Sequence, residues 1–395
     1  MEFAERLKRL GSENAFTVLG KVMELREKGK DVISFCIGEP DFDTPENIKK
    51  AAIDALNKNM THYGPSGGLP VFKRAIADHI SKSGKINVSE ENVCVSAGAK
   101  AIIYYAIHAL LNPGDEAIYP NPGYPTYESI INFVGGKAVP LPLLESRAFS
   151  FDADTLKKLI TKKTKLIIIN TPQNPTGGFL SKEDLQAIAD IAIKNNIYVL
   201  ADEIYSRILY EGEFNSIYAI PGMGERTILV NGFSKTYAMT GWRLGFGIAN
   251  KELIRELINL ENNCVACTTT FSQFAGIEAL TGPQNSVDEM VREYKDRRNL
   301  IVDLLNDIDG ISCLKPKGSF YVFPNITKAC RKLGLKDAEE FQDYLLYNHG
   351  VAVLARTSFG KKNENETEEY MRISYATSKD NISEGLKRIK KAVEK

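Results

Sequence analysis

Net charge is absent from this chain, whose 395 residues carry 50 lysines and arginines against 50 aspartates and glutamates. A protein without a strong field of one sign has no general attraction for nucleic acid or for an anionic membrane surface. Long apolar runs are also lacking, because the most hydrophobic stretch, residues 101–111, contains His108 and is too short to span a bilayer. We therefore expect no nucleic-acid partner and no membrane partner.

Cysteine and histidine are scarce, with six and four residues. Cysteines in apolar surroundings, such as Cys36 and Cys94, are typical of small core residues in a reducing compartment. Cys264 and Cys267 stand close together, but no second pair or histidine cluster accompanies them, so we predict no metal site and leave their role open. The first ten residues are charged and lack the apolar core of a secretory signal, which favours a cytoplasmic protein.

The sequence does contain a sustained alternation of short apolar strands and helical segments. Apolar runs such as 166–169 and 197–200 indicate buried strands of a mostly parallel sheet covered by helices on both faces. Towards the C-terminus this rhythm is lost, which indicates a smaller α+β region. We therefore assign residues 46–285 to a large α/β domain, and residues 1–45 together with 286–395 to a small α+β domain.

Three local predictions concern the N-terminal part of the chain. Residues 1–30 have a helical pattern, and residues 31–37 have the pattern of a strand. A helix is predicted from Pro45 to about Asn57, with Thr44 or Asp43 as its N-cap.

Polar and glycine residues follow the ends of the predicted strands, where open parallel sheets bind their ligands. These residues are Gly98, Ala99, Lys100, Asn174, Asp202, Tyr205, Ser234 and Lys235. Lys235 and Arg243 also lie in a loop between two apolar runs, where cations are favourable if the loop faces an anion. Taken singly, each residue has an ordinary alternative: Lys235 as a surface cation, Asp202 as a helix cap, Asn174 as a turn residue.

Together these residues provide the parts that pyridoxal phosphate requires. A lysine can form a Schiff base with its aldehyde, an acid can pair with its pyridinium nitrogen, and a cradle of donors can hold its phosphate. Lys235 and Asp202 fit the first two needs. The turn at residues 97–100, with Ser234 and Arg243, fits the third.

Over nearly its whole length the chain resembles the class I aminotransferases of fold type I, the aspartate aminotransferase family, and most closely its prokaryotic and archaeal branch. The motifs that carry the resemblance are Gly38-Glu-Pro-Asp-Phe-Asp-Thr-Pro45, Tyr63-Gly-Pro65, Asn174-Pro-Thr-Gly177, Asp202-Glu-Ile-Tyr205, Ser234-Lys-Thr-Tyr-Ala-Met-Thr-Gly-Trp-Arg243 and Arg372-Ile-Ser-Tyr-Ala376. The resemblance implies a seven-stranded, mostly parallel sheet between helices, a smaller α+β domain and pyridoxal 5′-phosphate as cofactor.

The resemblance also implies the reaction and the roles of its residues. An amino group would pass from an L-amino acid, with aspartate favoured, to a 2-oxo acid such as 2-oxoglutarate in a ping-pong cycle. Lys235 would bond to the cofactor aldehyde and shuttle the proton at the substrate Cα. Asp202 would keep the pyridine nitrogen protonated, and Tyr205 with Asn174 would hydrogen-bond the cofactor O3′.

Further contacts follow from the same resemblance. Those to the cofactor phosphate would come from Gly98, Ala99, Lys100, Ser234, Arg243 and, from the partner subunit of a homodimer, Tyr63. Tyr124 would stack on the pyridine ring, in a position where many relatives have tryptophan. Arg372 would hold the substrate α-carboxylate as a two-pronged donor, helped by Asn174 and by the Gly38 backbone.

The substrate side chain is left open by the sequence. Lys100 matches a lysine that some relatives use for the distal carboxylate of an acidic substrate, and we expect the segment 14–17 to line the pocket. Phe16 and Tyr321 would also suit an aromatic side chain. The alternatives are therefore an aromatic, alanine or broad-specificity aminotransferase, followed by a lyase that uses the same cofactor and fold.

Overall fold

The computed structural model describes residues 2–11, 13–84 and 86–394. Within these ranges the main sheet has eight strands in the order β2-β9-β8-β7-β6-β3-β4-β5. In that order the strands are Val93–Ser96, Gly245–Ile248, Thr227–Gly232, Tyr198–Asp202, Thr164–Asn170, Glu116–Asn121, Lys137–Leu144 and Ser150–Phe151. The predicted mostly parallel sheet is confirmed; the two-residue β5 adds an eighth strand to the seven expected.

Pairing directions explain which strand ends meet. The strands β8, β7, β6, β3 and β4 are parallel to one another. Strand β9 runs antiparallel to β8, and β2 runs antiparallel to β9, so β2 again points the same way as β8. The carboxyl ends of β2, β6, β7 and β8 therefore lie along one edge of the sheet.

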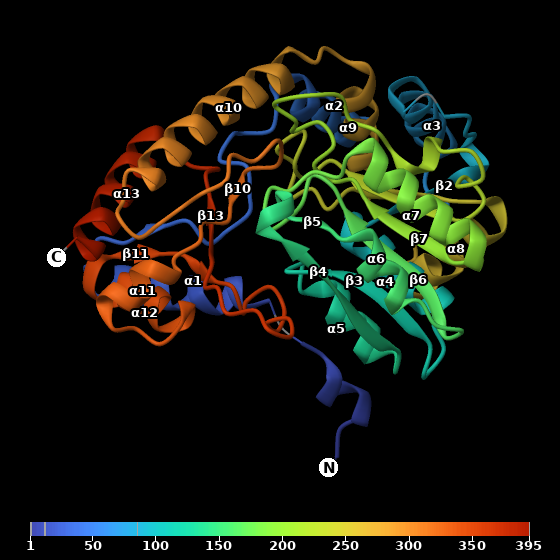
Figure 1. Cartoon of the computed structure of the whole chain (residues 1–395). Helices are drawn as coiled ribbons and strands as arrows, with labels where there is room; N and C mark the ends of the chain where they lie inside the picture. Colours follow the sequence, from blue (N-terminus) through green and yellow to red (C-terminus); the bar gives the residue numbers. More distant parts are fainter. Residues whose placement is uncertain (1, 12, 85, 395) are drawn as a thin grey trace.

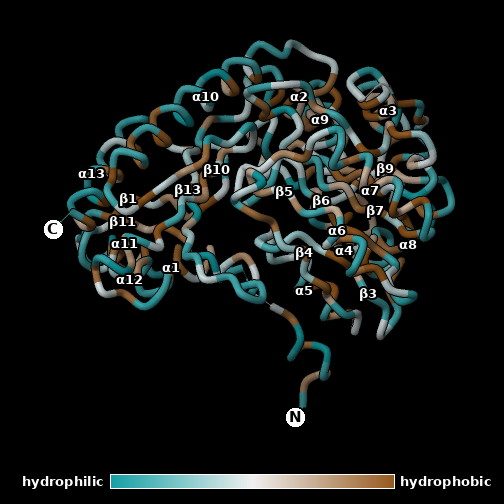
Figure 2. The backbone as a smooth tube through the Cα atoms, viewed as in Figure 1, coloured by the Kyte–Doolittle hydropathy of each residue, from teal (hydrophilic) through white to brown (hydrophobic). Residues whose placement is uncertain are grey.

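Helices cover both faces of this sheet (Figure 1). Ile168 packs in a core cluster with α4, α5 and α8, whereas its neighbours Ile167 and Ile169 pack in another with α6 and α7. This division follows from the alternation of side chains along a strand. These helices span Ala99–Leu110, Thr126–Phe133, Lys251–Val265, Ala153–Leu159 and Lys182–Asn195. Figure 2 shows hydrophobic residues along the strands and hydrophilic ones on the outer helices.

The remaining strands form two small sheets. A three-stranded antiparallel sheet has the order β10-β13-β12, with strands Tyr321–Val322, Met371–Ser374 and Leu354–Ala355. A parallel pair joins β1 (Ile33–Ser34) to β11 (Val351–Ala352). The other α-helices are α1 (Asn14–Glu27), α2 (Glu46–Asn57), α3 (Pro70–Gly84), α9 (Thr270–Thr281), α10 (Asn285–Asn306), α11 (Thr327–Leu333), α12 (Ala338–His349) and α13 (Lys379–Val393), with short 3₁₀ helices at Glu5–Arg9, Glu90–Asn92, Glu145–Arg147 and Ile217–Ala219.

Two of the local predictions are corrected by the structure. The single helix expected over residues 1–30 is a 3₁₀ helix, Glu5–Arg9, followed by α1 from Asn14; residues 1 and 12 lie outside the described ranges. Helix α2 begins after Pro45 without a side-chain cap, because the Thr44 hydroxyl instead donates a hydrogen bond to the Ala238 carbonyl. No helix in the described ranges is long and apolar enough to cross a membrane.

Candidate active site

A cavity of about 350 Å³ is lined by residues from the carboxyl edge of the main sheet, from the segment before α1 and from the small sheet. The predicted site residues that line it are Gly38, Ala99, Lys100, Tyr124, Asn174, Asp202, Tyr205, Ser234, Lys235, Arg243 and Arg372. Ligand pockets for small molecules typically measure about 300–1,000 Å³. Residues from distant parts of the sequence thus converge on a space of suitable size.

Lys235 reaches this cavity from the loop that follows β8. Its Nζ donates a hydrogen bond of 2.6 Å to the carbonyl of Gly38. Burial lowers the pKa of Lys235 to about 8, and the cations of Arg372 and Arg243 lower it too, although the Glu39 carboxylate acts in the opposite direction. An amine with a lowered pKa has a larger neutral fraction near neutral pH, and the neutral form is the nucleophile.

Asp202 is the last residue of β7, and its carboxylate is buried. Tyr127 donates a 2.6 Å hydrogen bond to Oδ2, and the Ile204 N–H lies 3.3 Å from Oδ1. Burial raises the pKa of Asp202 to about 6, while these two donors and Lys235 lower it in part. A buried carboxylate in this state favours a cationic hydrogen-bond donor as its partner.

The turn between β2 and α4 brings Ala99 and Lys100 to the cavity wall. Gly98 has φ +90°, and a Cβ at this position would lie 2.4 Å from Nη2 of Arg243. Arg243 itself adopts a left-handed backbone (φ 53°), which is a strained conformation for a side chain of this size. The N-terminus of α4, the Ser234 hydroxyl and the Arg243 guanidinium together offer the donors that a phosphate dianion requires.

Two tyrosines line the space between these groups. The Tyr205 hydroxyl lies 2.9 Å from the Tyr321 hydroxyl. Burial is the main cause that raises the pKa of Tyr205 well above its usual value, and the neighbouring Tyr321 raises it further. Tyr205 therefore remains protonated and can donate a hydrogen bond. Tyr124 donates its own hydroxyl proton to Glu13 over 2.9 Å.

Arg372 projects from β13 of the small sheet. Its Nη1 donates a 3.0 Å hydrogen bond to Oδ1 of Asn174, and its Nη2 donates to the Cys36 carbonyl. Only 4% of Arg372 is exposed, and its buried Nε has no hydrogen-bond partner. The Tyr321 and Phe359 rings lie 4.5 and 4.8 Å from the guanidinium carbon. A buried guanidinium with neutral partners and a free donor is suited to bind a carboxylate.

Two predicted residues lie away from the cavity wall. Gly98 is buried beneath Arg243 rather than lining the cavity, and Tyr63 is 90% exposed. The phosphate contact of Tyr63 was predicted for a partner subunit and stays a prediction. Among the described residues, no group of three or more His, Cys, Asp or Glu is placed to hold a metal ion.

Several residues around the cavity were not predicted from the sequence. Tyr127 holds Asp202, Glu13 contacts Lys100, and Phe359 packs on Arg372. No local pattern distinguishes these side chains from ordinary helix or loop residues. The expected segment 14–17 does contribute Asn14, Ala15 and Phe16 to the wall.

The residues present therefore fit pyridoxal phosphate on three structural grounds. Lys235 has a lowered pKa, Asp202 is a buried acid on the cavity wall, and a side chain at Gly98 would collide with Arg243. This fold and this set of side chains are those of enzymes that hold pyridoxal phosphate through a lysine.

Comparison with known proteins agrees with a site for pyridoxal phosphate. Residues 30–389 match the model of the family Aminotransferase class I and II. The aspartate aminotransferase of Pyrococcus horikoshii is 43% identical over 379 residues, covering 95% of this chain and 94% of the relative. Aromatic-amino-acid aminotransferase 2 of Thermococcus litoralis is 38% identical, covering 94% of each. The crystal structure of the aspartate aminotransferase from Rhizobium meliloti superposes with a TM-score of 0.94 at 34% identity, covering 100% of this chain and 99% of the other. The chain belongs to the aminotransferase class I and II family and is a pyridoxal-phosphate-dependent aminotransferase.

Proposed function

We propose that this aminotransferase takes its amino group from L-aspartate and delivers it to a 2-oxo acid such as 2-oxoglutarate. The observation that carries the proposal is the placement of two cations, Arg372 and Lys100, along the wall of one cavity with Lys235. A dicarboxylic substrate has an anion for each of them. The 43% identical relative from Pyrococcus horikoshii is also named aspartate aminotransferase.

When bound, pyridoxal phosphate supplies an electron-accepting ring for the electron pair left when the substrate Cα–H bond breaks. Lys235 would hold the cofactor through its aldehyde, and its free amine would move the proton at the substrate Cα. Asp202, which Tyr127 holds by a hydrogen bond, would accept the hydrogen bond of the pyridine N–H and keep that proton in place.

The binding roles divide between the two sides of the cavity. Ser234, Arg243 and the backbone at Ala99 and Lys100 would hold the phosphate, while Gly98, whose own N–H donates to the Ser96 carbonyl over 2.7 Å, leaves the space that Arg243 occupies. Tyr205 and Asn174 would donate to the cofactor hydroxyl, and Tyr124 would pack on its ring. Arg372 holds the substrate α-carboxylate beside Asn174 and the Gly38 backbone, which fixes the Cα–H bond within reach of Lys235.

A homodimer with shared active sites belongs to the same proposal, with the exposed Tyr63 donating to the phosphate held by the partner. We also propose the two domains expected from the sequence, a large one of residues 46–285 and a small one of residues 1–45 together with 286–395. All strands of both small sheets lie in the residues of the small domain, which supports this assignment. The six cysteines, all described and unpaired, support a cytoplasmic location.

The direct test is a donor panel. Protein loaded with pyridoxal phosphate should lose its visible absorption band when aspartate is added and regain it with 2-oxoglutarate. Alanine, phenylalanine and tyrosine are the comparison donors, and Lys235→Ala is the inactive control. Undiminished transamination by Lys235→Ala would exclude the mechanism, and release of ammonia or carbon dioxide would indicate a lyase instead.

An aromatic donor is the second candidate. Phe16, Tyr321 and Phe359 line the cavity and provide apolar surface for a ring. The relative from Thermococcus litoralis is named for aromatic amino acids. A higher kcat/KM for phenylalanine than for aspartate in the same panel would favour it.

A further inference from the structure

Glu13 places a carboxylate of the protein itself against a cation in the substrate pocket. Its Oε1 contacts Nζ of Lys100 and accepts hydrogen bonds from the hydroxyls of Tyr124 (2.9 Å) and Thr126 (3.2 Å). Burial by itself would raise the pKa of Glu13, but Lys100 and the two hydroxyls outweigh it and lower that pKa. Glu13 is therefore an ionised acceptor for three donors on the cavity wall.

This arrangement differs from that of the other cations in the pocket. In the described part of the chain, Lys235 and Arg372 contact neutral carbonyl or amide oxygens, whereas Lys100 is paired with a carboxylate. Arg372 is thus ready for a substrate anion, but Lys100 is not until Glu13 leaves.

The segment that carries Glu13 is fixed from both sides. On one side, the Gly11 N–H donates to the Ser129 hydroxyl over 2.9 Å and Arg9 donates to the Asn132 carbonyl over 2.8 Å, which ties the segment to α5. On the other, the Asn14 amide donates to the Ser358 hydroxyl over 2.8 Å.

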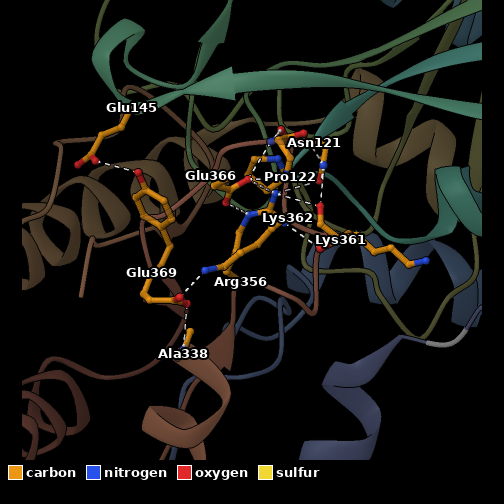
Figure 3. A network of polar contacts seen from close by, with 12 residues as sticks. Asn121, Pro122, Glu145, Ala338, Arg356, Lys361, Lys362, Glu366 and Glu369 are labelled. Atoms are coloured by element: carbon orange, nitrogen blue, oxygen red, sulfur yellow. Dashed lines mark hydrogen bonds and ion pairs between the residues drawn. The ribbon is translucent and has the colours of Figure 1, made fainter. Parts of the chain in front are cut away.

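The loop that carries Ser358 is anchored by a buried network around Arg356 (Figure 3). Arg356 is fully buried and pairs with Glu366 through two nitrogens, at 2.6 and 2.9 Å, and Nη2 also contacts Asn121 at 3.2 Å. The network anchors the loop that carries Ser358 to the end of β3. The placement of Glu13 is therefore a built feature of the fold.

The Glu13–Lys100 pair is also partly solvated, since 22% of the Glu13 side chain and 48% of the Lys100 side chain are exposed. Ion pairs at such exposure have small net free energies, so another carboxylate can replace Glu13. A ping-pong aminotransferase binds donor and acceptor in the same pocket, and their side chains can differ in charge.

We infer that Glu13 is a displaceable internal counterion of Lys100, which leaves the pocket when the distal carboxylate of an acidic substrate binds and stays when the substrate side chain is uncharged. This inference rests on the proposed function. It makes Glu13 a specificity-determining residue: with Glu13 in place Lys100 is neutralised and the pocket accepts an apolar side chain, and with Glu13 displaced it accepts a dicarboxylate.

The test uses two unreactive ligands of the cofactor-loaded enzyme, measured by titration calorimetry. Succinate carries two carboxylates, and 3-phenylpropionate carries one carboxylate and an apolar ring. Glu13→Gln removes the competing charge, so succinate should bind about tenfold more tightly, while 3-phenylpropionate should bind equally or more weakly. Glu24→Gln, on α1 but outside the pocket, should change neither affinity.

Lys100→Gln completes the cycle. Displacement requires Lys100, so in the Lys100→Gln background the further change Glu13→Gln should no longer improve succinate binding. If Glu13→Gln improved succinate affinity as much in the Lys100→Gln background as in the wild type, the gain would come from simple repulsion between Glu13 and succinate, and the inference would be overturned. An equal change for both ligands, or no gain for succinate, would overturn it too. Failure of the proposed function would instead appear in the donor panel as a lower kcat/KM for aspartate than for phenylalanine, while the succinate affinities still report on Glu13.

Discussion

The side-chain amide of Asn174 and the guanidinium of Arg372 are joined by a hydrogen bond of 3.0 Å, although 198 positions separate them in the chain. Asn174 follows β6 of the main sheet, and Arg372 lies in β13 of the small sheet. This contact fixes the orientation of the arginine relative to Lys235, which follows β8. The geometry of the substrate site therefore depends on how the two parts of the chain pack.

Replacing Arg372 by lysine keeps the charge but removes the planar pair of donors and the contact to Asn174. We expect kcat/KM for aspartate to fall by about 100-fold to 1,000-fold, because a charge-assisted two-pronged contact is lost. Steady-state kinetics measures this effect. Arg74→Lys, at a surface ion pair with Glu90, serves as the control and should have wild-type kinetics.

Tyr127→Phe should weaken cofactor binding most at acid pH. The Tyr127 hydroxyl lowers the pKa of Asp202, which burial raises to about 6, so its removal raises that pKa further. Because the ionised carboxylate is the form that pairs with the pyridine N–H, affinity is lost as pH falls through this pKa, and in the variant the loss begins at higher pH. Quenching of the single tryptophan, Trp242, can report cofactor affinity between pH 5 and pH 8. The cofactor's own titration is common to both proteins, so identical midpoints would contradict the role of Tyr127.

The reaction of Lys235 with the cofactor aldehyde should depend on pH with a midpoint near its pKa of about 8. The folded pKa is lowered, so the neutral amine forms as pH rises through about 8, below the usual value for lysine. Glu39→Gln removes a carboxylate that raises this pKa and should move the midpoint to lower pH. Rates of appearance of the visible band, measured from pH 6 to pH 10, test both statements. A midpoint above pH 10 in the wild type would contradict them.

Glu366→Gln should destabilise the protein by about 3 kcal/mol, because it leaves the buried Arg356 guanidinium without its carboxylate. Urea unfolding followed by circular dichroism measures the change. Glu364 lies on the same loop and its side chain is exposed. The control variant Glu364→Gln should therefore have the free energy of unfolding of the wild type. Equal stabilities for the two variants would show that the network in Figure 3 contributes little.

Subunit mixing tests the proposed dimer and the role of Tyr63. In a shared site, Lys235→Ala inactivates its own subunit's site, whereas Tyr63→Ala impairs the site of the partner. A mixed dimer then has one site with both lesions and one with neither, so re-association of equal amounts should restore about a quarter of wild-type activity. Recovery no greater than the average of the two separate variants would contradict shared sites.

The strands of the main sheet were well predicted from the sequence, because buried parallel strands are short runs of apolar residues. The runs around Ile167 and Leu200 appear in the structure as β6 and β7. The small sheets were predicted less well. A strand was expected over residues 31–37, but only Ile33–Ser34 forms one, because the pairing with β11 extends over two residues. Such pairing depends on β11, more than 300 residues away, and leaves little local pattern.

The sequence by itself determined the residue types of the site, because a Schiff-base lysine, a buried acid and glycine turns follow apolar strands in a specific order. Lys235, Asp202, Asn174 and Arg372 belong to that set. Only the tertiary structure decided what surrounds them: Tyr127 on Asp202, Phe359 on Arg372 and Glu13 on Lys100. These contacts join distant elements through packing of the sheet edge, the segment before α1 and the loop after β12. Side chains that act through such packing carry no local signature, since their neighbours are set by the fold rather than by the chain around them.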